Sequence, residues 1–345
     1  MKTKWGVWGS GGIARRRTIP EGILKAKNAE LCAVTGNDPD NVREVAAEFG
    51  AQACVSEQDL IESTSDVIYI ATPVHLHLSQ VKRAAEAGKH VFCEKPLGLN
   101  VAEAEEMVRV CRANGVKFGV GFMMRFHAQH QAALHLIEEG RLGAPVFARA
   151  QFSCWYPPIP GAWRQDPATG GGGSLMDLAA HCLDLLEMLF GRIGRVSCSI
   201  ANHIQAYRSE DTALVLGEFE SGARGMVDAL FNVPDASSRN RLELYGSLGS
   251  ILAEGTIGQG ETGEMVSYLE TEARDYEAQQ TREPGKTTPI NPAPVNLYRA
   301  EVEAFSQAVL DDTVPPVSGE DGLRIQKVLA ACYESAAAGR AVHVR

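Results

Sequence analysis

The sequence predicts an α/β protein with an N-terminal doubly wound parallel sheet of Rossmann type and a C-terminal α+β domain that contains an open, mostly antiparallel sheet. Over about the first 120 residues, short apolar runs alternate with helical patterns, and after residue 122 strand-like runs follow one another across short turns. A chain of 345 residues exceeds the roughly 250–300 residues at which single cores stop growing. We therefore expect a dinucleotide-binding domain at 1–122 and a substrate-binding and oligomerisation domain at 123–345.

The elements of the first domain alternate in type. Strands are expected at 4–8, 30–35, 66–71, 89–93 and 116–121, with helices at 12–26, 40–49, 75–87 and 100–114. Strands that alternate with helices form right-handed βαβ units, which give a parallel sheet covered on both faces. The run 66–71 is nearly all apolar, as a strand buried on both faces should be.

The second domain has a different pattern. Helices are expected at 128–139 and 174–190, and strands at 145–154, 195–206, 211–219, 223–231, 240–246 and 249–254. Short turns such as 220–222 favour antiparallel neighbours. The polar stretch 255–296 is expected to be a long surface excursion. Helices at 297–311 and 319–339 close the chain, and we expect them to be able to pack back on the first domain.

Charge and composition exclude several classes of partner. Lys and Arg number 33 against 43 Asp and Glu, so the net charge is −10 and the protein repels nucleic acid and anionic lipid. No run approaches the ~20 apolar residues of a membrane span, and the N-terminus lacks the apolar segment of a signal peptide. Eight scattered cysteines without a C-x-x-C pair indicate reduced thiols in a cytoplasmic protein.

A glycine-rich turn predicts a dinucleotide site. The run Gly9-Ser10-Gly11-Gly12-Ile13-Ala14 fits G-x-G-x-x-G/A between a strand and a helix, which is the context that the motif requires. Its glycines make the turn and let the backbone approach a pyrophosphate, and the small last residue lets the helix pack closely. The helix N-terminus adds N–H groups and a partial positive charge. We expect Gly9, Gly11, Gly12, Ile13 and Ala14 to bind the cofactor.

The end of the second strand bears on which cofactor binds. An acid on the ribose 2′-OH is expected there, but the sequence reads Thr35-Gly36-Asn37-Asp38, with Gly36 in the position of the acid. Small and polar residues leave room for a 2′-phosphate and favour NADP, whereas Asp38 keeps NAD possible. The basic run 15–17 has two readings, a solvated face or a phosphate ligand, because cations oppose the dipole in a first helical turn.

A lysine, a histidine and a carboxylate are the candidate chemical groups. Lys95 follows an apolar run at the carboxyl end of a parallel strand, the edge at which open α/β sheets bind ligands, and Pro96 disfavours helical backbone at Lys95. The helix 174–190 is apolar almost all round and is therefore expected to be buried. It carries Asp177, His181 and Asp184 at positions i, i+4 and i+7.

Two readings of that helix stripe are open: a His–Asp pair satisfied in the core, or groups that move a proton while a nicotinamide moves a hydride. The four glycines at 170–173 favour the second, because they let a ligand approach the backbone closely. Metal binding is not expected. His75-x-His77 and His127-x-x-His130 lack a carboxylate or cysteine at convincing spacing.

These motifs together resemble the glucose–fructose oxidoreductase / inositol dehydrogenase (Gfo/Idh/MocA) family over nearly the whole chain. The matching segments are the turn at 9–14, Ala71-Thr72-Pro73 with His77, 87–91 running into Glu94-Lys95-Pro96, Trp163-Arg164, 171–181 and 317–321. The resemblance implies a Rossmann domain, and a second domain whose open sheet often forms the oligomer interface. A homodimer or homotetramer is therefore expected.

The resemblance also implies roles. Lys95 would touch the reacting oxygen, His181 would be the general base or acid, and Asp177 would orient that histidine or bind a substrate hydroxyl. Further cofactor contacts are expected from Thr35, Gly36, Asn37, Asp38, Thr72, Pro73, His77, Glu94 and Lys95. Substrate contacts are expected from Lys95, Arg125, Tyr156, Trp163, Arg164, Asp177 and His181. For Tyr156, Trp163 and Arg164, which could form a wall suited to sugar rings, simple packing is an equal alternative.

Some positions depart from the family pattern. Val74 stands where the family usually has Asn, and no Pro follows Arg125 closely. The glucose–fructose enzyme has a tyrosine where this chain has His181, so its internal redox cycle is not expected. The function expected is an NAD(P)-dependent dehydrogenase or reductase acting on a secondary hydroxyl or keto group of a sugar, sugar derivative or cyclitol. The alternatives are a non-catalytic NAD(P)-binding sensor, against which the intact Lys95/Asp177/His181 set argues, and a dihydrodiol-type dehydrogenase.

Overall fold

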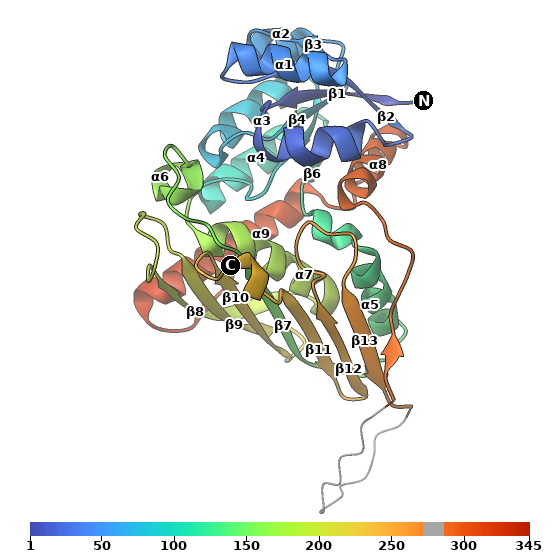
Figure 1. Ribbon diagram of the computed structural model, residues 1–345, viewed down its shortest axis with the longest axis vertical. Coiled ribbons are helices and arrows are strands. Elements are labelled where there is room, and N and C mark those ends of the chain that lie inside the picture. The colour runs from blue at the N-terminus through green and yellow to red at the C-terminus, as the bar shows by residue number, and fades with distance from the viewer. Residues whose placement is uncertain (272–285) are drawn as a thin grey trace, which may run out of the picture. The chain divides into compact units, whose positions relative to one another are not determined.

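The computed structural model describes residues 1–271 and 286–345, which form two compact units (Figure 1). Unit 1 consists of Met1–Met123, Ile159–Asp177 and Asn296–Ala330, and the remaining described residues form unit 2. Two later stretches of chain therefore join the N-terminal one in unit 1. No helix within the described ranges is both long and apolar enough to cross a membrane.

The sheet of unit 1 is parallel throughout, with strand order β3-β2-β1-β4-β5-β6. Its strands are β1 (Thr3–Trp8), β2 (Ala29–Thr35), β3 (Gln52–Ala53), β4 (Val67–Ile70), β5 (His90–Cys93) and β6 (Phe118–Val120). This is the Rossmann order, in which the chain reverses direction across the sheet between β1 and β4. The predicted fold class is confirmed, and β4 is fully buried, as its apolar sequence predicted.

Helices lie on both faces of this sheet (Figure 1). The π-helical segment η1 (Ala14–Ile23), α1 (Pro39–Phe49) and α8 (Leu297–Leu310) contact one another or β1 and β2. On the other face are α2 (Glu57–Glu62), α3 (His77–Glu86, after the 3₁₀ turn η2, Val74–Leu76) and α4 (Val101–Ala113). Trp5, Phe92 and Phe305 meet ring to ring under η1 and α8, with centroids 5.2–5.8 Å apart. Helix α8 thus completes the core of unit 1.

Local sequence explains the helix ends around the site. Helix α1 begins after Asp38, whose side chain accepts from the N–H groups of Asp40 and Asn41, and it ends at Gly50 in the left-handed region. Helix α2 begins at a capping box formed by Ser56 and Asp59. Neither α2 nor β3 was predicted, because both are too short to show a periodic pattern.

Unit 2 is built on a nine-stranded sheet with order β14-β13-β12-β11-β7-β10-β9-β8-β15. Its strands are β7 (Pro145–Ser153), β8 (Ile193–Ala201), β9 (Thr212–Phe219), β10 (Arg224–Leu230), β11 (Arg241–Gly246), β12 (Gly249–Glu254), β13 (Glu264–Leu269), β14 (Thr288–Pro289) and β15 (Val342–His343). All neighbours are antiparallel except β7 and β10. The expectation of a mostly antiparallel sheet is therefore confirmed.

Helix α7 (Ala180–Phe190) packs on β7 and β10, and α5 (Ala128–Glu138) packs on α7. The last helix, α9 (Gly319–Ala338), contributes residues to both units. The remaining short elements are η3 (Met123–Phe126), η4 (Trp163–Gln165), α6 (Pro167–Gly170), η5 (Leu175–Ala179) and η6 (Asp235–Ser237).

Two sequence expectations need correction. The stretch 255–296 is not simply an excursion, since β13 and β14 extend the sheet with an alternating burial pattern in β13; the part at 272–285 lies outside the described residues. The helix expected at 174–190 is not uniform, because η5 is a π-helical turn that precedes α7. Asp177 and His181 therefore lack the regular i, i+4 relation that the sequence suggested.

Candidate active site

The glycine-rich turn leaves its backbone open. A Cβ atom at Gly11 or Gly12 would meet no atom within 4 Å, so a ligand has room to reach both peptides. Gly9 has a φ of +121° and its Cβ would lie 2.7 Å from the carbonyl oxygen of Ala71, so only glycine fits there. This cradle beside η1 fits a dinucleotide pyrophosphate.

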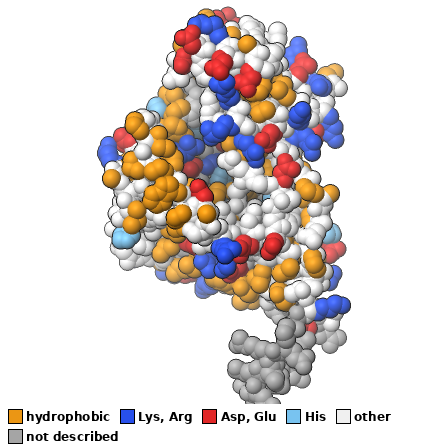
Figure 2. Space-filling model, in the orientation of Figure 1, with side chains coloured by type: hydrophobic (Ala, Val, Ile, Leu, Met, Phe, Trp, Pro, Cys, Tyr) orange, Lys and Arg blue, Asp and Glu red, His pale blue; other side chains and the backbone are white. Residues whose placement is uncertain are grey.

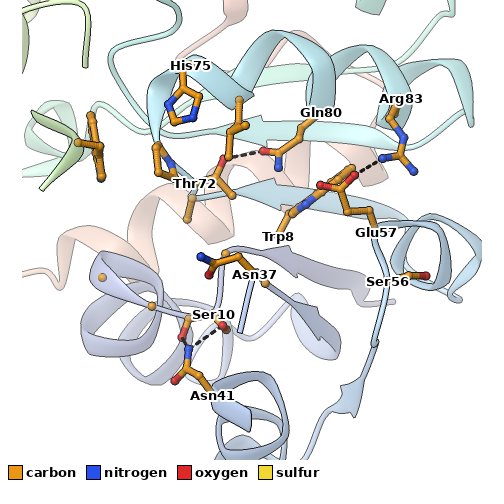
Figure 3. Close-up of a pocket in the computed structure, with 18 of the residues that line it drawn as sticks. Trp8, Ser10, Asn37, Asn41, Ser56, Glu57, Thr72, His75, Gln80 and Arg83 are labelled. Carbon is orange, nitrogen blue, oxygen red and sulfur yellow. Dashed lines mark hydrogen bonds and ion pairs between the residues drawn. The ribbon is translucent and has the colours of Figure 1, made fainter. Parts of the chain in front are cut away.

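A cavity of about 840 Å³ opens above this turn, inside unit 1 (Figure 3). Seven of the expected cofactor residues line it: Gly9, Gly11, Gly12, Gly36, Asn37, Thr72 and Pro73. The lining comes from the carboxyl ends of β1, β2 and β4, which is where open α/β sheets bind nucleotides.

Three other expected cofactor residues serve the fold instead of lining this cavity. The Thr35 hydroxyl donates to the carbonyl oxygen of Cys54 at 2.9 Å, and Asp38 caps α1. The His77 ring lies within 3.2 Å of the carbonyl oxygen of Leu97 and 3.0 Å of that of Thr72, and burial lowers its pKa. His77 thus ties the Thr72 loop to the segment after β5.

Ile13 and Ala14 open η1 next to this cavity, and Ala14 is fully buried. Neither residue is among those that line the cavity. Their position agrees with the packing role of the last residue of the motif, which brings the helix close to the strand.

The sequence analysis did not predict the residues that line the cavity from Trp8, the 55–58 segment and α3. The guanidinium carbon of Arg83 lies 5.4 Å from the ring centroid of Trp8, and Arg83 also pairs with the carboxylate of Glu57 (Figure 3). The Thr72 hydroxyl donates to Gln80 at 2.5 Å. Leu76, the N-cap of α3, and Gln80 and Arg83 within α3 follow one another at helical spacing, a pattern visible in the sequence.

Ser10 and Asn41 fill the space beside Gly36. Asn41 Nδ2 donates to Ser10 Oγ at 2.8 Å, and a Cβ at Gly36 would lie only 2.5 Å from that oxygen. The position where an acid was expected therefore excludes any side chain while Ser10 keeps its place. Neutral donors and acceptors occupy this corner of the cavity.

Lys95 lies in a compact charge cluster at the end of β5. Its Nζ donates to Asp177 Oδ1 at 2.6 Å and to the Asp177 carbonyl oxygen at 3.0 Å. Arg164 Nε lies 3.3 Å from the same Oδ1, and the Arg164 guanidinium stacks 4.0 Å above the Trp163 ring, which lines the cofactor cavity. The side chains of Lys95 and Asp177 are only 9% and 16% exposed. The Asp177 carboxylate thus orients two cations, Lys95 and Arg164. The Lys95–Pro96 peptide bond is cis.

Glu94, just before this lysine, accepts a hydrogen bond of 2.5 Å from the Tyr69 hydroxyl. The Tyr69 hydroxyl lies 3.0 Å from that of Thr18 on η1. Burial raises the pKa of Glu94, whereas the Tyr69 hydrogen bond and the charge of Lys95 act against that rise. Burial also raises the pKa of Tyr69 well above its usual value.

The expected residues of unit 2 have partners of their own. His181 is buried in α7, with its ring centroid 6.2 Å from that of Phe152. Arg125 forms a bidentate ion pair with Asp184, in which Nη2 donates to Oδ1 at 2.6 Å and Nε donates to Oδ2 at 2.9 Å. Asp177 and Asp184, expected on one stripe, therefore bind different cations.

Tyr156 and the pair His127 and His130 have packing roles. The Tyr156 ring lies 4.9 Å from that of Phe231, and its carbonyl oxygen accepts from Tyr207. The rings of His127 and His130 stack 4.6 Å apart in the interior, and burial lowers the pKa of His130 to about 3. Within the described ranges, no three His, Cys, Asp or Glu side chains gather as a metal site would require.

Acidic and basic side chains are interspersed on the face seen in Figure 2. No broad basic surface appears on that face.

Comparison with known proteins agrees with this geometry. Residues 3–122 match the NAD-binding Rossmann fold of the Gfo/Idh/MocA oxidoreductase family, and residues 135–344 match its C-terminal alpha/beta domain. The chain is similar to 1,5-anhydro-D-fructose reductase from Ensifer adhaerens, with 28% identity over 345 residues, covering 99% of this chain and 98% of the relative. It is also similar to a D-xylose 1-dehydrogenase (NADP(+)) from Haloferax volcanii, with 28% identity and 99% of each chain covered.

Among solved structures, an aldose–aldose oxidoreductase from Caulobacter crescentus, complexed with glycerol, matches with a TM-score of 0.88 at 26% identity. The match covers 99% of this chain and 100% of that one. The resemblance inferred from the motifs is therefore confirmed. The chain belongs to the Gfo/Idh/MocA oxidoreductase family, and it carries that family's NAD-binding Rossmann domain.

Proposed function

We propose that this protein is an NAD(P)-dependent dehydrogenase or reductase that acts on a secondary hydroxyl or keto carbon of a sugar, sugar derivative or cyclitol. The observation that carries the proposal is the Lys95–Asp177–Arg164 cluster, which lies at the same carboxyl edge of the sheet as the glycine cradle. The relatives named above, which act on anhydrofructose and xylose by name, support a carbohydrate substrate.

The cavity indicates how the dinucleotide lies. Gly9, Gly11 and Gly12, with the N-terminus of η1, would hold the pyrophosphate. Asn37 and the 55–58 segment, on the β2–β3 side, would receive the adenosine half. Thr72, Pro73, Glu94 and Lys95, on the β4–β5 side, would receive the nicotinamide half. When bound, the nicotinamide ring accepts or donates the hydride.

The protein's own groups would handle the proton. Lys95, held by Asp177 at 2.6 Å, would donate a hydrogen bond to the reacting oxygen and favour the charge that develops there. His181 would take or return the hydroxyl proton, a task suited to an imidazole. Trp163, Arg164 and Tyr156 would line the substrate site. Arg125 is proposed to support this region through Asp184.

We propose that NADP is the preferred cofactor. Gly36 carries no carboxylate to repel a 2′-phosphate, and the Asp38 carboxylate is engaged as the cap of α1. Arg15 pairs with Glu44 and Glu48 on α1, so the basic run does not supply an arginine to the cavity lining. Fluorescence titration should show tighter binding of NADPH than of NADH, and a clear reverse preference would refute the Gly36 argument.

The exposed side chains of β9 support a further part of the proposal, a homodimer or homotetramer. Leu214 and Leu216 are 43% and 58% exposed, while Ala213 and Val215 between and beside them are buried. The sheet of unit 2 therefore has one packed face and one outer face on which exposed leucines lie among charged pairs such as Arg149–Asp228, and a second copy could cover these leucines.

Absorbance of reduced nicotinamide in the near ultraviolet tests the activity. The purified protein would be incubated with NAD⁺ and NADP⁺ against aldoses, glycosides, inositols, anhydro-sugars and dihydrodiols, and with reduced cofactor against keto-sugars. Turnover with a carbohydrate would support the proposal. Cofactor binding without turnover across the panel would favour the sensor alternative.

Two variants test the assignment of the catalytic groups. Lys95→Ala and His181→Ala should each lower turnover by about 10²–10⁴-fold. Cofactor binding, measured by fluorescence, should survive in both. Near-wild-type rates in both variants would contradict the assignment.

A further inference from the structure

A chain of hydrogen-bonded polar groups leads from Glu94, next to Lys95, into the interior, and the proposed function gives its members Tyr69 and Thr18 no role. Thr18 on η1, Tyr69 on β4 and Glu94 after β5 are linked by hydrogen bonds of 3.0 and 2.5 Å. The hydroxyls of Thr18 and Tyr69 are buried between the sheet and its covering helices. A hydrogen bond between a phenol and a carboxylate in such a place is strong, and its loss leaves a costly buried group.

The surroundings of Glu94 decide its charge. Lys95 and Arg164 favour the carboxylate, whereas burial raises the pKa of Glu94. The charge of Glu94 in turn contributes to the raised pKa values of Cys93, its neighbour in the chain, and of Tyr298 on α8. Tyr69 donates a side-chain hydrogen bond of 2.5 Å to Glu94 Oε1.

Glu301, on α8, is the second carboxyl near Glu94. It is 2% exposed, and burial together with the charge of Glu94 raises its pKa well above the usual range. Two buried carboxyls near each other do not both ionise easily. Burial therefore favours the protonated form of Glu301, whereas the hydrogen bond from Tyr69 and the charges of Lys95 and Arg164 favour the carboxylate of Glu94.

This arrangement sets the net charge beside the reacting end of the cofactor. With Glu94 ionised, the four groups Lys95, Arg164, Asp177 and Glu94 sum to zero, and with Glu94 protonated they sum to +1. A nicotinamide ring carries a positive charge when oxidised and none when reduced. The cluster with Glu94 ionised therefore binds the oxidised cofactor more favourably than the cluster with Glu94 protonated does.

We propose that Tyr69, supported by Thr18, is a positioning residue that holds Glu94 as a carboxylate and thereby sets the relative affinity of the protein for oxidised and reduced cofactor. This inference rests on the proposed function, because it places the nicotinamide half of the cofactor on the β4–β5 side of the sheet.

The test measures the dissociation constants of NADP⁺ and NADPH by calorimetry between pH 6 and pH 9, without substrate. Tyr69→Phe removes only the hydroxyl. Since a hydrogen bond to a charged group is worth about a factor of ten or more, the ratio Kd(NADP⁺)/Kd(NADPH) should rise about tenfold above wild type at pH 6. As the pH rises and Glu94 ionises, the ratio should fall back toward the wild-type value.

Two further variants make the result specific. Glu94→Gln keeps the shape and should give a raised ratio that no longer changes with pH. Tyr333→Phe is the control, because Tyr333 is a half-buried tyrosine that donates to a carboxylate, that of Glu210, at 2.9 Å in unit 2. It should lower stability in the same manner as Tyr69→Phe and leave the ratio at the wild-type value.

The outcomes separate this inference from the proposed function. Failure of the wild-type protein to bind either cofactor would overturn both. Wild-type binding with a ratio that stays flat in Tyr69→Phe and Glu94→Gln would overturn the inference alone and leave Tyr69 as a packing residue. If Tyr69→Phe does not fold, Thr18→Val, which removes the hydroxyl that supports Tyr69, takes its place and should raise the ratio in the same direction, whereas a wild-type ratio in that variant would overturn the inference.

Discussion

Replacing Glu301 by Gln should make the free energy of unfolding depend less steeply on pH. Glu301 is 2% exposed on α8, and within the described residues its Oε2 atom has no hydrogen-bond partner. Burial and the neighbouring charge of Glu94 raise its pKa well above the usual value. The folded protein therefore keeps a proton on Glu301 at pH values at which the unfolded chain releases it.

The sign of the effect follows from proton linkage. Below the pKa of the unfolded chain, Glu301 is protonated in both states and its full contribution to stability is present. As the pH rises from there toward the folded pKa, the folded state binds more protons than the unfolded state, so stability falls by about 1.4 kcal/mol per pH unit. Glutamine does not titrate and removes this loss.

The assay is urea denaturation of wild type and Glu301→Gln at pH 5, 6, 7, 8 and 9. At acid pH the variant should be less stable, because a buried amide without full partners costs about 1–3 kcal/mol. The variant should then gain on the wild type as the pH rises toward the folded pKa of Glu301. Glu303→Gln is the control on the same helix, where Glu303 is half-buried and accepts from the Lys27 N–H at 3.1 Å.

A difference between Glu301→Gln and wild type that stays constant from pH 5 to pH 9 would refute the reasoning. It would mean that Glu301 titrates alike in the folded and unfolded states. The same slope in Glu303→Gln would show instead that the loss of any carboxylate on α8 suffices.

Two other substitutions test Arg125 and Gly36. Arg125→Met removes the cation that pairs with the Asp184 carboxylate, which is 1% exposed, and should lower the free energy of unfolding by about 3–5 kcal/mol in denaturant titrations. Adding Asp184→Leu should restore most of that stability. A raised KM at unchanged stability would instead make Arg125 a substrate ligand. Gly36→Asp should weaken cofactor binding because its Cβ would lie 2.5 Å from Ser10 Oγ. The double variant Gly36→Asp/Ser10→Gly should bind again in fluorescence titrations, now with NADH favoured over NADPH, and an unchanged preference would count against the 2′-phosphate argument.

The regular elements could be predicted because their apolar periods are long enough to show. The strand at Val67–Ile70 and the cradle at Gly9 follow directly from apolar runs and the spacing of glycines. The short elements β3 and α2 could not be predicted this way, and β13 was hidden in a polar stretch because only alternate residues of an outer strand are buried.

The sequence predicted which residues belong to the candidate site better than it predicted which of them contact one another. Lys95 and Asp177 were both expected, but their contact of 2.6 Å depends on the π-helical turn at η5, which no spacing rule announces. Tyr69 looked like any strand residue, and its bond to Glu94 arises because adjacent strands place both side chains together. Contacts of this kind belong to tertiary structure and leave no local pattern.

The composite make-up of unit 1 has a consequence for how the protein is made. Phe305, on α8, completes the aromatic core around Trp5 and Phe92, yet it leaves the ribosome long after the strands that it covers. At roughly 5–20 residues per second, the roughly 200 residues between 122 and 330 take about 10–40 s to synthesise. During that time η1 and α1 cover only part of one apolar face of the nascent sheet, and the part that α8 packs on stays exposed. We therefore expect a fragment ending near residue 122 to aggregate or to require a chaperone, and the first unit to mature only when translation is nearly complete.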